Sequence, residues 1–213
     1  TLNMIKEFEP SLKVKSIKSG KKVFDWKIPE EWNISDAYVL DHNNKKIIDF
    51  KKNNLHLIGY SVPINKNISK KELFSRLYSL PSQPEAIPYI TSYYKKYWGF
   101  CISNNDKKKI VNKLKKISNN KKVLFAKIDS SFKKNGKLNY GEIFIPGFSK
   151  KEIFLSTYIC HPSMANNELS GPLVAIALVN YFQKKKNYYS IRVIFIPETI
   201  GAISYIEKNL INL

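Results

Sequence analysis

The stretch between residues 153 and 201 constrains the fold of this chain more than any other part of the sequence. It begins with residues 153–160, a short apolar run of β-branched and aromatic residues that is typical of a strand buried on both faces. An apolar segment with helical spacing follows, and Pro172 suits the first turn of that helix. Residues 191–196 are a second buried strand. A β-α-β unit of this length predicts an α/β fold with two parallel strands joined by a right-handed crossover.

Polar residues follow each of these two strands. His161 comes directly after the first strand and Glu198 comes after the second, with the polar loop 163–170 between them. Because ligands of open α/β sheets bind at the carboxyl ends of the strands, this edge is the predicted site. A His-Pro turn without a chemical role is the alternative for His161. Glu198 on the same edge favours a metal or substrate role instead.

The chain has a formal net charge of +19 at pH 7, which raises the question of a nucleic-acid partner. Only Arg76 and Arg192 are arginine among the 36 basic residues. Bidentate recognition of phosphates and bases favours arginine, whereas these lysines are spread along the whole chain. No nucleic-acid recognition signature occurs in the sequence. We therefore expect no nucleic-acid partner.

The apolar runs are too short for a membrane span, which needs roughly 20 residues. The first ten residues, TLNMIKEFEP, lack the apolar core and the cleavage site of a signal peptide. Cys101 and Cys160 lie in apolar strand-like runs, where reduced buried thiols are expected rather than a disulfide. These features favour a cytoplasmic protein without a membrane partner. The chain starts at Thr1 and ends at Leu213 within a helical pattern, so we expect a fragment of a longer protein.

A mostly β insert is expected to interrupt the α/β domain. Residues 123–128 and 138–145 are expected to pair as a hairpin around Asn135-Gly136. Short strands separated by turn residues precede them, and two helices are expected at residues 70–80 and 107–117.

These patterns give a domain organisation. Residues 27–148 are expected to form the inserted β-rich domain, and residues 1–26 and 149–213 the incomplete α/β domain. Within the insert, a segment rich in proline and aromatic residues contains Tyr93 and Tyr94. These rings are either packed against one another in a rigid loop or available as substrate-binding residues, because aromatic side chains line most ligand pockets.

The order of motifs resembles a known family. A His after a strand, an amide or acidic residue before Ser-Gly, and a strand followed by Glu-x-x-Gly resemble the zinc exopeptidases of the bacterial aminopeptidase fold. The segments YICHPSMANNELSGP and FIPETIG more closely resemble bacterial proteins with an aminopeptidase-like domain and a β-rich insert, often associated with surface-polysaccharide genes. KKVFDWKIPEEW and IPYITSYYKKYWGFC extend this resemblance through most of the chain.

The resemblance implies a zinc cofactor and assigns roles to individual residues. His161 is the implied ligand of the first metal, Asn167 stands where a carboxylate would bridge two metals, and Glu198 stands where the general base would be. Thr199 replaces a second Glu, and further ligands are expected beyond the last residue. Asn is neutral and Thr is a poor zinc ligand, so one zinc is expected rather than two. Glu168 is the nearest spare carboxylate: it is assigned to substrate binding, and it could also compensate for the lost carboxylate or face solvent.

The sequence therefore favours a zinc-dependent, aminopeptidase-like hydrolase that acts on a peptide or another amide bond, with a role in surface-polysaccharide metabolism. An N-acyl sugar stays open as substrate, since no acidic cluster that would anchor a free amine is visible. The alternative is a catalytically inactive peptidase fold that serves as a glycan- or protein-binding module.

Overall fold

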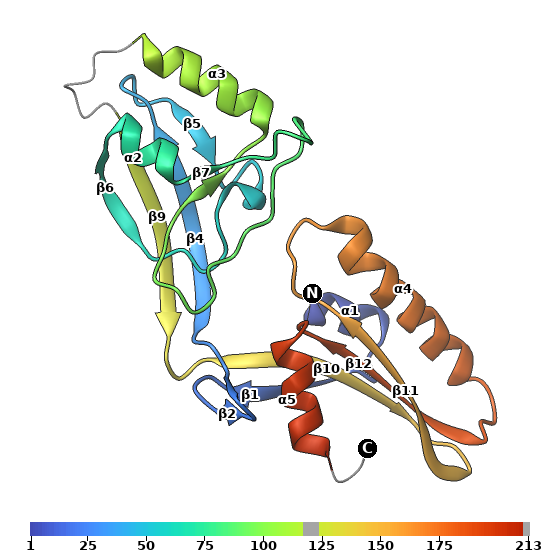
Figure 1. Cartoon of the computed structure of the whole chain (residues 1–213). Coiled ribbons are helices and arrows are strands. Elements are labelled where there is room, and N and C mark those ends of the chain that lie inside the picture. The colour runs from blue at the N-terminus through green and yellow to red at the C-terminus, as the bar shows by residue number, and fades with distance from the viewer. Residues whose placement is uncertain (117–123, 211–213) are drawn as a thin grey trace. The chain divides into compact units, whose positions relative to one another are not determined.

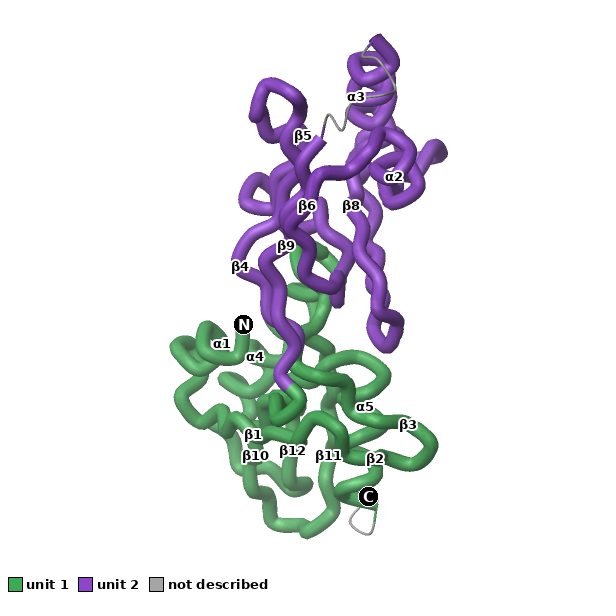
Figure 2. Tube along the Cα trace, turned by 90° about the vertical axis from the view of Figure 1, so that its left-hand side faces the viewer, with its two compact units in different colours: residues 1–31, 134–213 green, residues 32–133 purple. Residues whose placement is uncertain are grey.

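The computed structural model describes residues 1–116 and 124–210 (Figure 1). The chain divides into two compact units, Thr1–Glu31 with Lys134–Leu213, and Trp32–Lys133 (Figure 2). Residues 27–31 and 134–148, which we assigned to the insert, therefore belong to the first unit. None of the helices in the described part of the chain is long and apolar enough to span a membrane.

The first unit contains the predicted β-α-β arrangement. Its four-stranded sheet has the order β1-β10-β12-β11. Strand β11 runs parallel to β12 with Ile153 opposite Ile191, which confirms the predicted parallel pair, and the other two neighbouring pairs are antiparallel. The elements of this unit are α1 (Leu2–Phe8), β1 (Lys13–Lys18), β2 (Lys22–Val23), β3 (Trp26–Lys27), β10 (Lys137–Ile145), β11 (Ser149–Tyr158), α4 (Ala165–Phe182), β12 (Tyr189–Ile196) and α5 (Ile200–Asn209).

Strand β12 lies at the centre of this unit because its side chains alternate between two cores. Val193 and Phe195 pack in one buried cluster with Val179 of α4. Ile194 and Ile196 pack in another cluster with residues of α5. Residues 191–196 are buried apart from the half-buried Arg192, so the prediction of a buried strand is confirmed. Strand β11 differs, because most of its residues are exposed.

Helix α4 begins at Ala165, seven residues before the proline that was expected in its first turn. Pro172 therefore lies inside the helix, where it cannot donate a backbone hydrogen bond. The polar residues that suggested a loop form the first turns instead, and Glu168 there suits the positive end of the helix dipole. This earlier start places Glu168 on an ordered element.

Gly171 allows α4 to approach β11 closely. A Cβ added at this position would collide with Oγ1 of Thr157. We expect Gly171→Ala to lower the free energy of unfolding by about 1–3 kcal/mol, because overpacking forces the helix or the strand to move. Chemical denaturation measures this change. Combining it with Thr157→Ala removes the obstructing hydroxyl and is expected to recover most of the loss. Full additivity of the two changes would contradict the proposed collision.

The predicted hairpin around Asn135-Gly136 is wrong. Strand β9 (Leu124–Lys133) pairs with strands of the second unit, whereas β10 pairs with β1 and β12 of the first. The turn redirects the chain from one sheet into another, because Ile143 and Ile145 of β10 are buried against β12 and α4. Residue 123 of the predicted strand lies outside the described residues.

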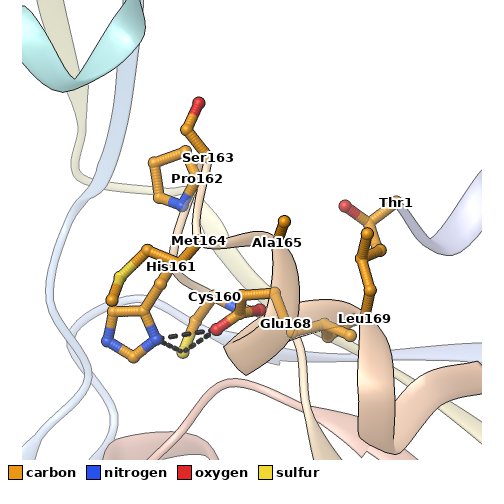
Figure 3. Close-up of a pocket in the computed structure, with 10 residues that line it drawn as sticks. Thr1, Cys160, His161, Pro162, Ser163, Met164, Ala165, Glu168 and Leu169 are labelled. Carbon is orange, nitrogen blue, oxygen red and sulfur yellow. Dashed lines mark hydrogen bonds and ion pairs between the residues drawn. The ribbon is translucent and has the colours of Figure 1, made fainter.

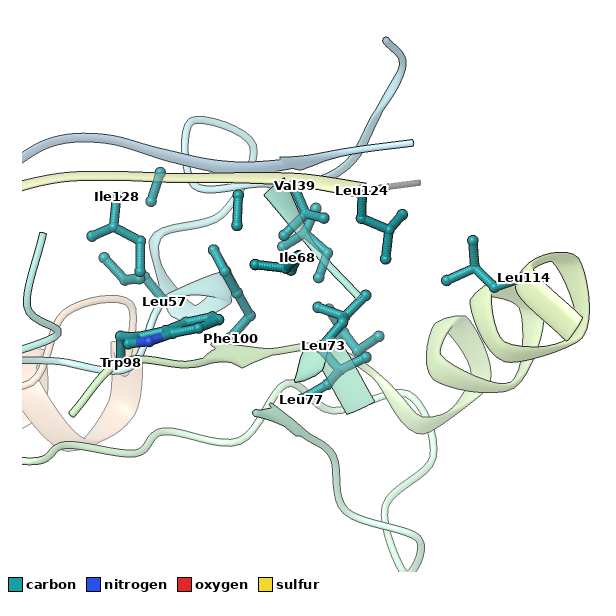
Figure 4. Close-up of a cluster of buried hydrophobic side chains, with 14 residues drawn as sticks. Val39, Leu57, Ile68, Leu73, Leu77, Trp98, Phe100, Leu114, Leu124 and Ile128 are labelled. Atoms are coloured by element: carbon teal, nitrogen blue, oxygen red, sulfur yellow. The ribbon is translucent and has the colours of Figure 1, made fainter. Parts of the chain in front are cut away.

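The second unit is mostly β, as expected. Its main sheet has the order β5-β4-β9-β6, and β7 pairs with β8 in parallel. Buried side chains including Phe100, Trp98 and Leu124 form its core (Figure 4). The expected helix at 70–80 ends early because Leu77 and Tyr78 pair as a strand with β8, and residue 117 of the other helix lies outside the described residues. The elements are β4 (Glu31–Leu40), β5 (Lys46–Asp49), η1 (Asn54–His56), β6 (Ile64–Ile68), α2 (Lys70–Ser75), β7 (Leu77–Tyr78), β8 (Phe100–Cys101) and α3 (Asn104–Lys115).

A charged network crosses the sheet of the first unit. Arg192 of β12 binds both carboxylate oxygens of Glu152, at 2.6 and 2.7 Å, and also the buried Glu142 at 3.0 Å. The hydrogen bonds from Arg192 lower the pKa of the Glu152 carboxyl.

This lowered pKa predicts a pH dependence of stability. The contribution of Glu152 is fully present above the ordinary carboxyl pKa and is lost as the pH falls through the lower pKa of the folded state. The pair is partly exposed, so we expect less than about 1 kcal/mol. Glu152→Gln should flatten the acid side of the stability profile, measured by urea unfolding between about pH 3 and 7. An unchanged acid side in this variant would contradict the assignment.

Candidate functional site

His161 and Glu198 emerge at the same edge of the sheet. His161 lies three residues after the end of β11, and Glu198 lies two residues after the end of β12. The backbone N–H of Ile159 still donates to the carbonyl of Ile196 at 3.1 Å, which keeps the two chains paired up to these loops. The parallel strands thus bring together two residues that are 37 positions apart in the sequence.

The imidazole of His161 lies between two carboxylates. Its Nδ1 is 2.7 Å from Oε1 of Glu168, and its Nε2 is 3.5 Å from Oε2 of Glu198. Figure 3 shows the first of these contacts. When Nδ1–H donates to Glu168, the Nε2 lone pair points toward the carboxylate of Glu198. Two electron-rich groups facing each other are complementary to a cation or a proton between them.

Glu168 connects α4 with the loop after β11. Its Oε2 accepts the backbone N–H of Cys160 at 2.6 Å, while its Oε1 holds His161. The side chain is only 12% exposed. Both oxygens are thus engaged by groups of the chain itself, whereas the sequence reasoning had assigned Glu168 to substrate binding. No sequence signal identified this contact, because it depends on the early start of α4.

Cys160 is a site residue that the sequence reasoning treated only as a buried thiol. Its Sγ accepts the backbone N–H of Glu198 at 3.3 Å and lies 3.2 Å from Nδ1 of His161. Burial, followed by the nearby carboxylates, raises the pKa of this thiol to about 11, although the N–H of Glu198 opposes the shift. Cys160, His161 and Glu198 offer ligand atoms within 4.8 Å of one another. Since Sγ lies beside Nδ1 and Glu198 lies beside Nε2, we interpret Cys160 as a link between the two loops.

Strained backbone follows both site residues. Ser163 has a φ of 60°, and Thr199, which follows Glu198 directly, has a φ of 57°. Positive φ is uncommon for residues other than glycine and is an outlier for a β-branched residue such as threonine. Such strain is concentrated at functional sites, where the surrounding structure holds it in place.

Asn167 and the two tyrosines lie in other surroundings. The side-chain amide of Asn167 donates to the hydroxyl of Tyr158 at 2.8 Å and lines a groove between β11 and α4. His161 and Glu168 instead line a pocket of about 430 Å³. Tyr93 and Tyr94 belong to the second unit, where Tyr93 packs 5.2 Å from the ring of Tyr60. Their roles in metal and substrate binding stay predictions.

Comparisons with known proteins agree with this fold. A Clostridium acetobutylicum protein named as a polysaccharide biosynthesis protein with an aminopeptidase-like domain is 43% identical over 209 residues, which cover 98% of this chain and 46% of that protein. The crystal structure of a candidate peptidase from C. acetobutylicum has a TM-score of 0.88 at 42% identity, covering 99% of this chain and 47% of that one. This chain thus spans about half the length of these relatives.

A peptidase M28 precursor from Shewanella amazonensis has a TM-score of 0.58 at 9% identity, covering 99% of this chain and 61% of that one, and this likeness concerns the fold alone. The fold is thus of the peptidase M28, zinc-exopeptidase-like class, which confirms the resemblance of the sequence motifs. The profile described as Domain of unknown function (DUF4910) matches residues 1–213, and the chain belongs to the DUF4910 family.

Proposed function

We propose that this chain contributes the site of a metal-dependent, aminopeptidase-like hydrolase that cleaves an amide bond. The observation that carries the proposal is the position of Nε2 of His161, 3.5 Å from Glu198, while Nδ1 is held by Glu168. An imidazole oriented by a carboxylate through one nitrogen and directed at a second carboxylate through the other is the arrangement of a histidine metal ligand.

The residues fit one zinc ligand with a base beside it. Zinc binds His nitrogen at about 2.0–2.1 Å, and Nε2 of His161 is the atom that would hold the ion. The Glu198 carboxylate, 3.5 Å from Nε2, lies close enough to take a proton from a water molecule beside the ion. Catalytic zinc typically has three protein ligands, and Cys160 lies on the other side of the imidazole. A bound zinc would polarise the amide carbonyl and lower the pKa of a water molecule.

The residues of this chain bind the cation, transfer the proton and orient the side chains that do so. His161 holds the cation through Nε2, and Glu198 acts as the general base that takes the proton of the attacking water and passes it to the leaving amine. Glu168 is a positioning residue that holds the imidazole in the orientation with Nε2 directed at Glu198. The strained Thr199 sets the direction of Glu198 at the start of α5.

The positioning role predicts the effect of Glu168→Gln. Gln keeps the size of the side chain but removes the charge that orients His161, so we expect zinc affinity to fall by about 10–100-fold. Competition with a chelator measures this affinity in whichever length of the polypeptide binds zinc. Glu207→Gln is a matched control, because Glu207 is paired with Lys21 on the surface of α5. Unchanged zinc affinity in Glu168→Gln would contradict the positioning role.

The name of a relative suggests the substrate, and the cysteines suggest the location of the protein. A role in surface-polysaccharide metabolism follows the name of the C. acetobutylicum relative, and a peptide or an N-acyl sugar has the required amide bond. Tyr93 and Tyr94 are proposed to contact it. The two free thiols support a cytoplasmic location. A screen of peptide and N-acyl sugar hydrolysis with and without added zinc tests this assignment, and a zinc-independent hydrolysis would refute it.

A second function is favoured by two other residues. Asn167 and Thr199 stand where the resemblance implies carboxylates, which would leave an inactive fold that binds glycans or proteins. Zinc binding separates the two proposals: the hydrolase requires it at His161, whereas a binding module retains its ligand affinity in His161→Ala.

A further inference from the structure

The end of the first unit's sheet that lies opposite His161 carries exposed aromatic and basic side chains. It is formed by residues 148–151, where β11 begins, and by residues 181–189, which contain the end of α4 and the start of β12. We call it the strand-start surface and define it by these two segments. Because β11 and β12 run parallel, this surface lies at the other end of both strands from His161 and Glu198.

The two segments of the strand-start surface are held together. The backbone N–H of Ser149 donates to the carbonyl of Tyr188 at 2.7 Å. A Cβ added at Gly147 would lie 2.4 Å from the backbone of Tyr189, so this close approach requires glycine. Figure 1 shows both segments at the end of the first unit where β11 and β12 begin. The strand-start surface is therefore one ordered surface rather than two independent loops.

Four aromatic side chains of this surface are exposed. The exposed fraction is 79% for Phe148, 67% for Tyr188, 57% for Tyr181 and 43% for Tyr189. Phenylalanine is normally among the most buried residues. A small ligand is enclosed by a concave site, whereas side chains this exposed project from the surface. They are therefore suited to insertion into a partner.

Exposed lysines accompany these rings. There are five in the two segments, namely Lys150, Lys151, Lys184, Lys185 and Lys186, and neither segment contains an acidic residue. Strand β11 pairs Ser149 with Tyr189 and Glu152 with Ser190, so the first two lysines form a bulge outside the regular ladder. Nζ of Lys185 lies 5.2 Å from the centre of the Tyr181 ring. Positive charge and aromatic rings are thus interleaved on this surface.

The composition of the surface favours one kind of partner. Recognition of a single phosphate or base at a fixed position favours the planar fork of arginine, and neither segment contains arginine. Lysine is a compact, hydrated charge that suits a diffuse anionic surface. Near an anionic lipid leaflet each lysine raises the affinity by roughly fivefold. Tyrosine is enriched at membrane–water interfaces, because its ring is apolar and its hydroxyl is polar.

We propose that the strand-start surface binds the anionic surface of a lipid membrane, with its lysines at the headgroups and with Phe148 and Tyr188 inserted between them. The expectation of no membrane partner was based on apolar runs shorter than the roughly 20 residues of a membrane span. Binding at the interface needs no such run, because exposed aromatic and basic side chains supply the contacts. This orientation directs the sheet edge with His161 and Glu198 away from the lipid.

Vesicle binding tests the proposal, with a polypeptide extended by its natural flanking sequence to the length of the relatives. Co-sedimentation compares vesicles of phosphatidylcholine with vesicles that also contain about 30% phosphatidylglycerol, an anionic lipid. We expect binding to the anionic vesicles to be at least about 10-fold tighter. Combining Lys184→Gln, Lys185→Gln and Lys186→Gln should weaken it about 100-fold, at roughly fivefold for each lysine.

The matched control combines Lys108→Gln, Lys115→Gln and Lys116→Gln. These three exposed lysines lie on α3 and at its C-cap in the second unit, so the control removes the same charge elsewhere. It should leave binding to the anionic vesicles within about threefold of the unmodified protein. An equal loss in both variants would attribute binding to the net charge of the whole chain and overturn the proposal.

The aromatic side chains give a second measurement. Phe148→Ala combined with Tyr188→Ala should weaken vesicle binding by about 10-fold, and the loss should persist in high salt because apolar contacts are not screened. Both side chains are exposed, so Tm should change by less than about 2 °C. In Phe148→Trp, the added fluorescence should be quenched by lipids with brominated acyl chains. Absence of quenching in vesicle-bound protein would overturn the insertion.

The remaining outcomes identify other occupants of the surface. Failure to bind anionic vesicles would overturn the proposal. If polygalacturonate, an acidic polysaccharide, bound instead, the surface would be assigned to a glycan. If Phe148→Ala dissociated a dimer that does not bind vesicles, the surface would be assigned to a second copy of the chain. None of these measurements depends on zinc or on hydrolysis.

Discussion

Glu198→Gln is expected to reduce amide hydrolysis by about 10²–10⁴-fold while zinc remains bound. The glutamine side chain has nearly the same shape and keeps an oxygen near Nε2 of His161, but it cannot accept the proton of the attacking water. Its backbone N–H also continues to donate to Sγ of Cys160, so the loop after β12 is expected to keep its place. The turnover rate and the zinc content are measured on the same preparation, in whichever length of the polypeptide is active.

The companion change, His161→Ala, is expected to remove zinc as well as activity. His161 is the only good zinc ligand of this chain that the resemblance identified, and its loss leaves Glu198 without a nitrogen partner. Elemental analysis of the variant measures the metal. His42→Ala is the control, because His42 is an exposed turn residue that contacts none of the site residues described above. Zinc retained in His161→Ala, or turnover retained in Glu198→Gln, would contradict the proposed roles.

The site edge could be predicted from the sequence because it depends on local patterns. A mostly apolar run such as residues 191–196, in which Arg192 is the one charged residue, indicates a buried strand, and two such runs joined by a helix favour a parallel pair. The residues that follow parallel strands must then meet at one edge. His161 and Glu198 are brought together by this topology alone, and the structure places them accordingly.

Glu168 could not be assigned in the same way. Its contact with His161 requires α4 to begin at Ala165, and a proline at position 172 argues locally against such a start. The burial of Pro172 and the hydrogen bonds of Glu168 outweigh that local preference. Only the assembled structure shows that the carboxylate faces the imidazole.

The predicted boundary between the two units differs from the observed one for a related reason. Asn135-Gly136 is a strong local signal for a hairpin. The pairing of β10 with β12 places Ile143 opposite Val193, 50 positions away in the sequence. No local sequence pattern predicts this pairing. Long-range pairing and burial therefore decide which sheet receives a strand, and a turn motif indicates only that the chain changes direction.

The second large effect that we expect concerns these two units, whose cores are separate. Phe100 and Phe195 are both fully buried, one in the core of the second unit and the other in that of the first. Phe100→Ala and Phe195→Ala should each cost about 3–5 kcal/mol of stability, because each leaves a cavity that its neighbours cannot fill. A loss of this size is a large share of the 5–15 kcal/mol that typically stabilises a domain.

The prediction also states which strands lose protection from hydrogen exchange in each variant. In hydrogen exchange, Phe100→Ala should accelerate the amides of β4 and β9, while those of β12 keep most of their protection. Phe195→Ala should do the reverse, with acceleration in β10 and β12. The backbone amides of Thr157 in β11 and Glu168 in α4 then report on the first unit, because these two elements position the site. If either variant accelerated exchange equally in both units, the two cores would unfold together, and the chain would behave as one cooperative domain.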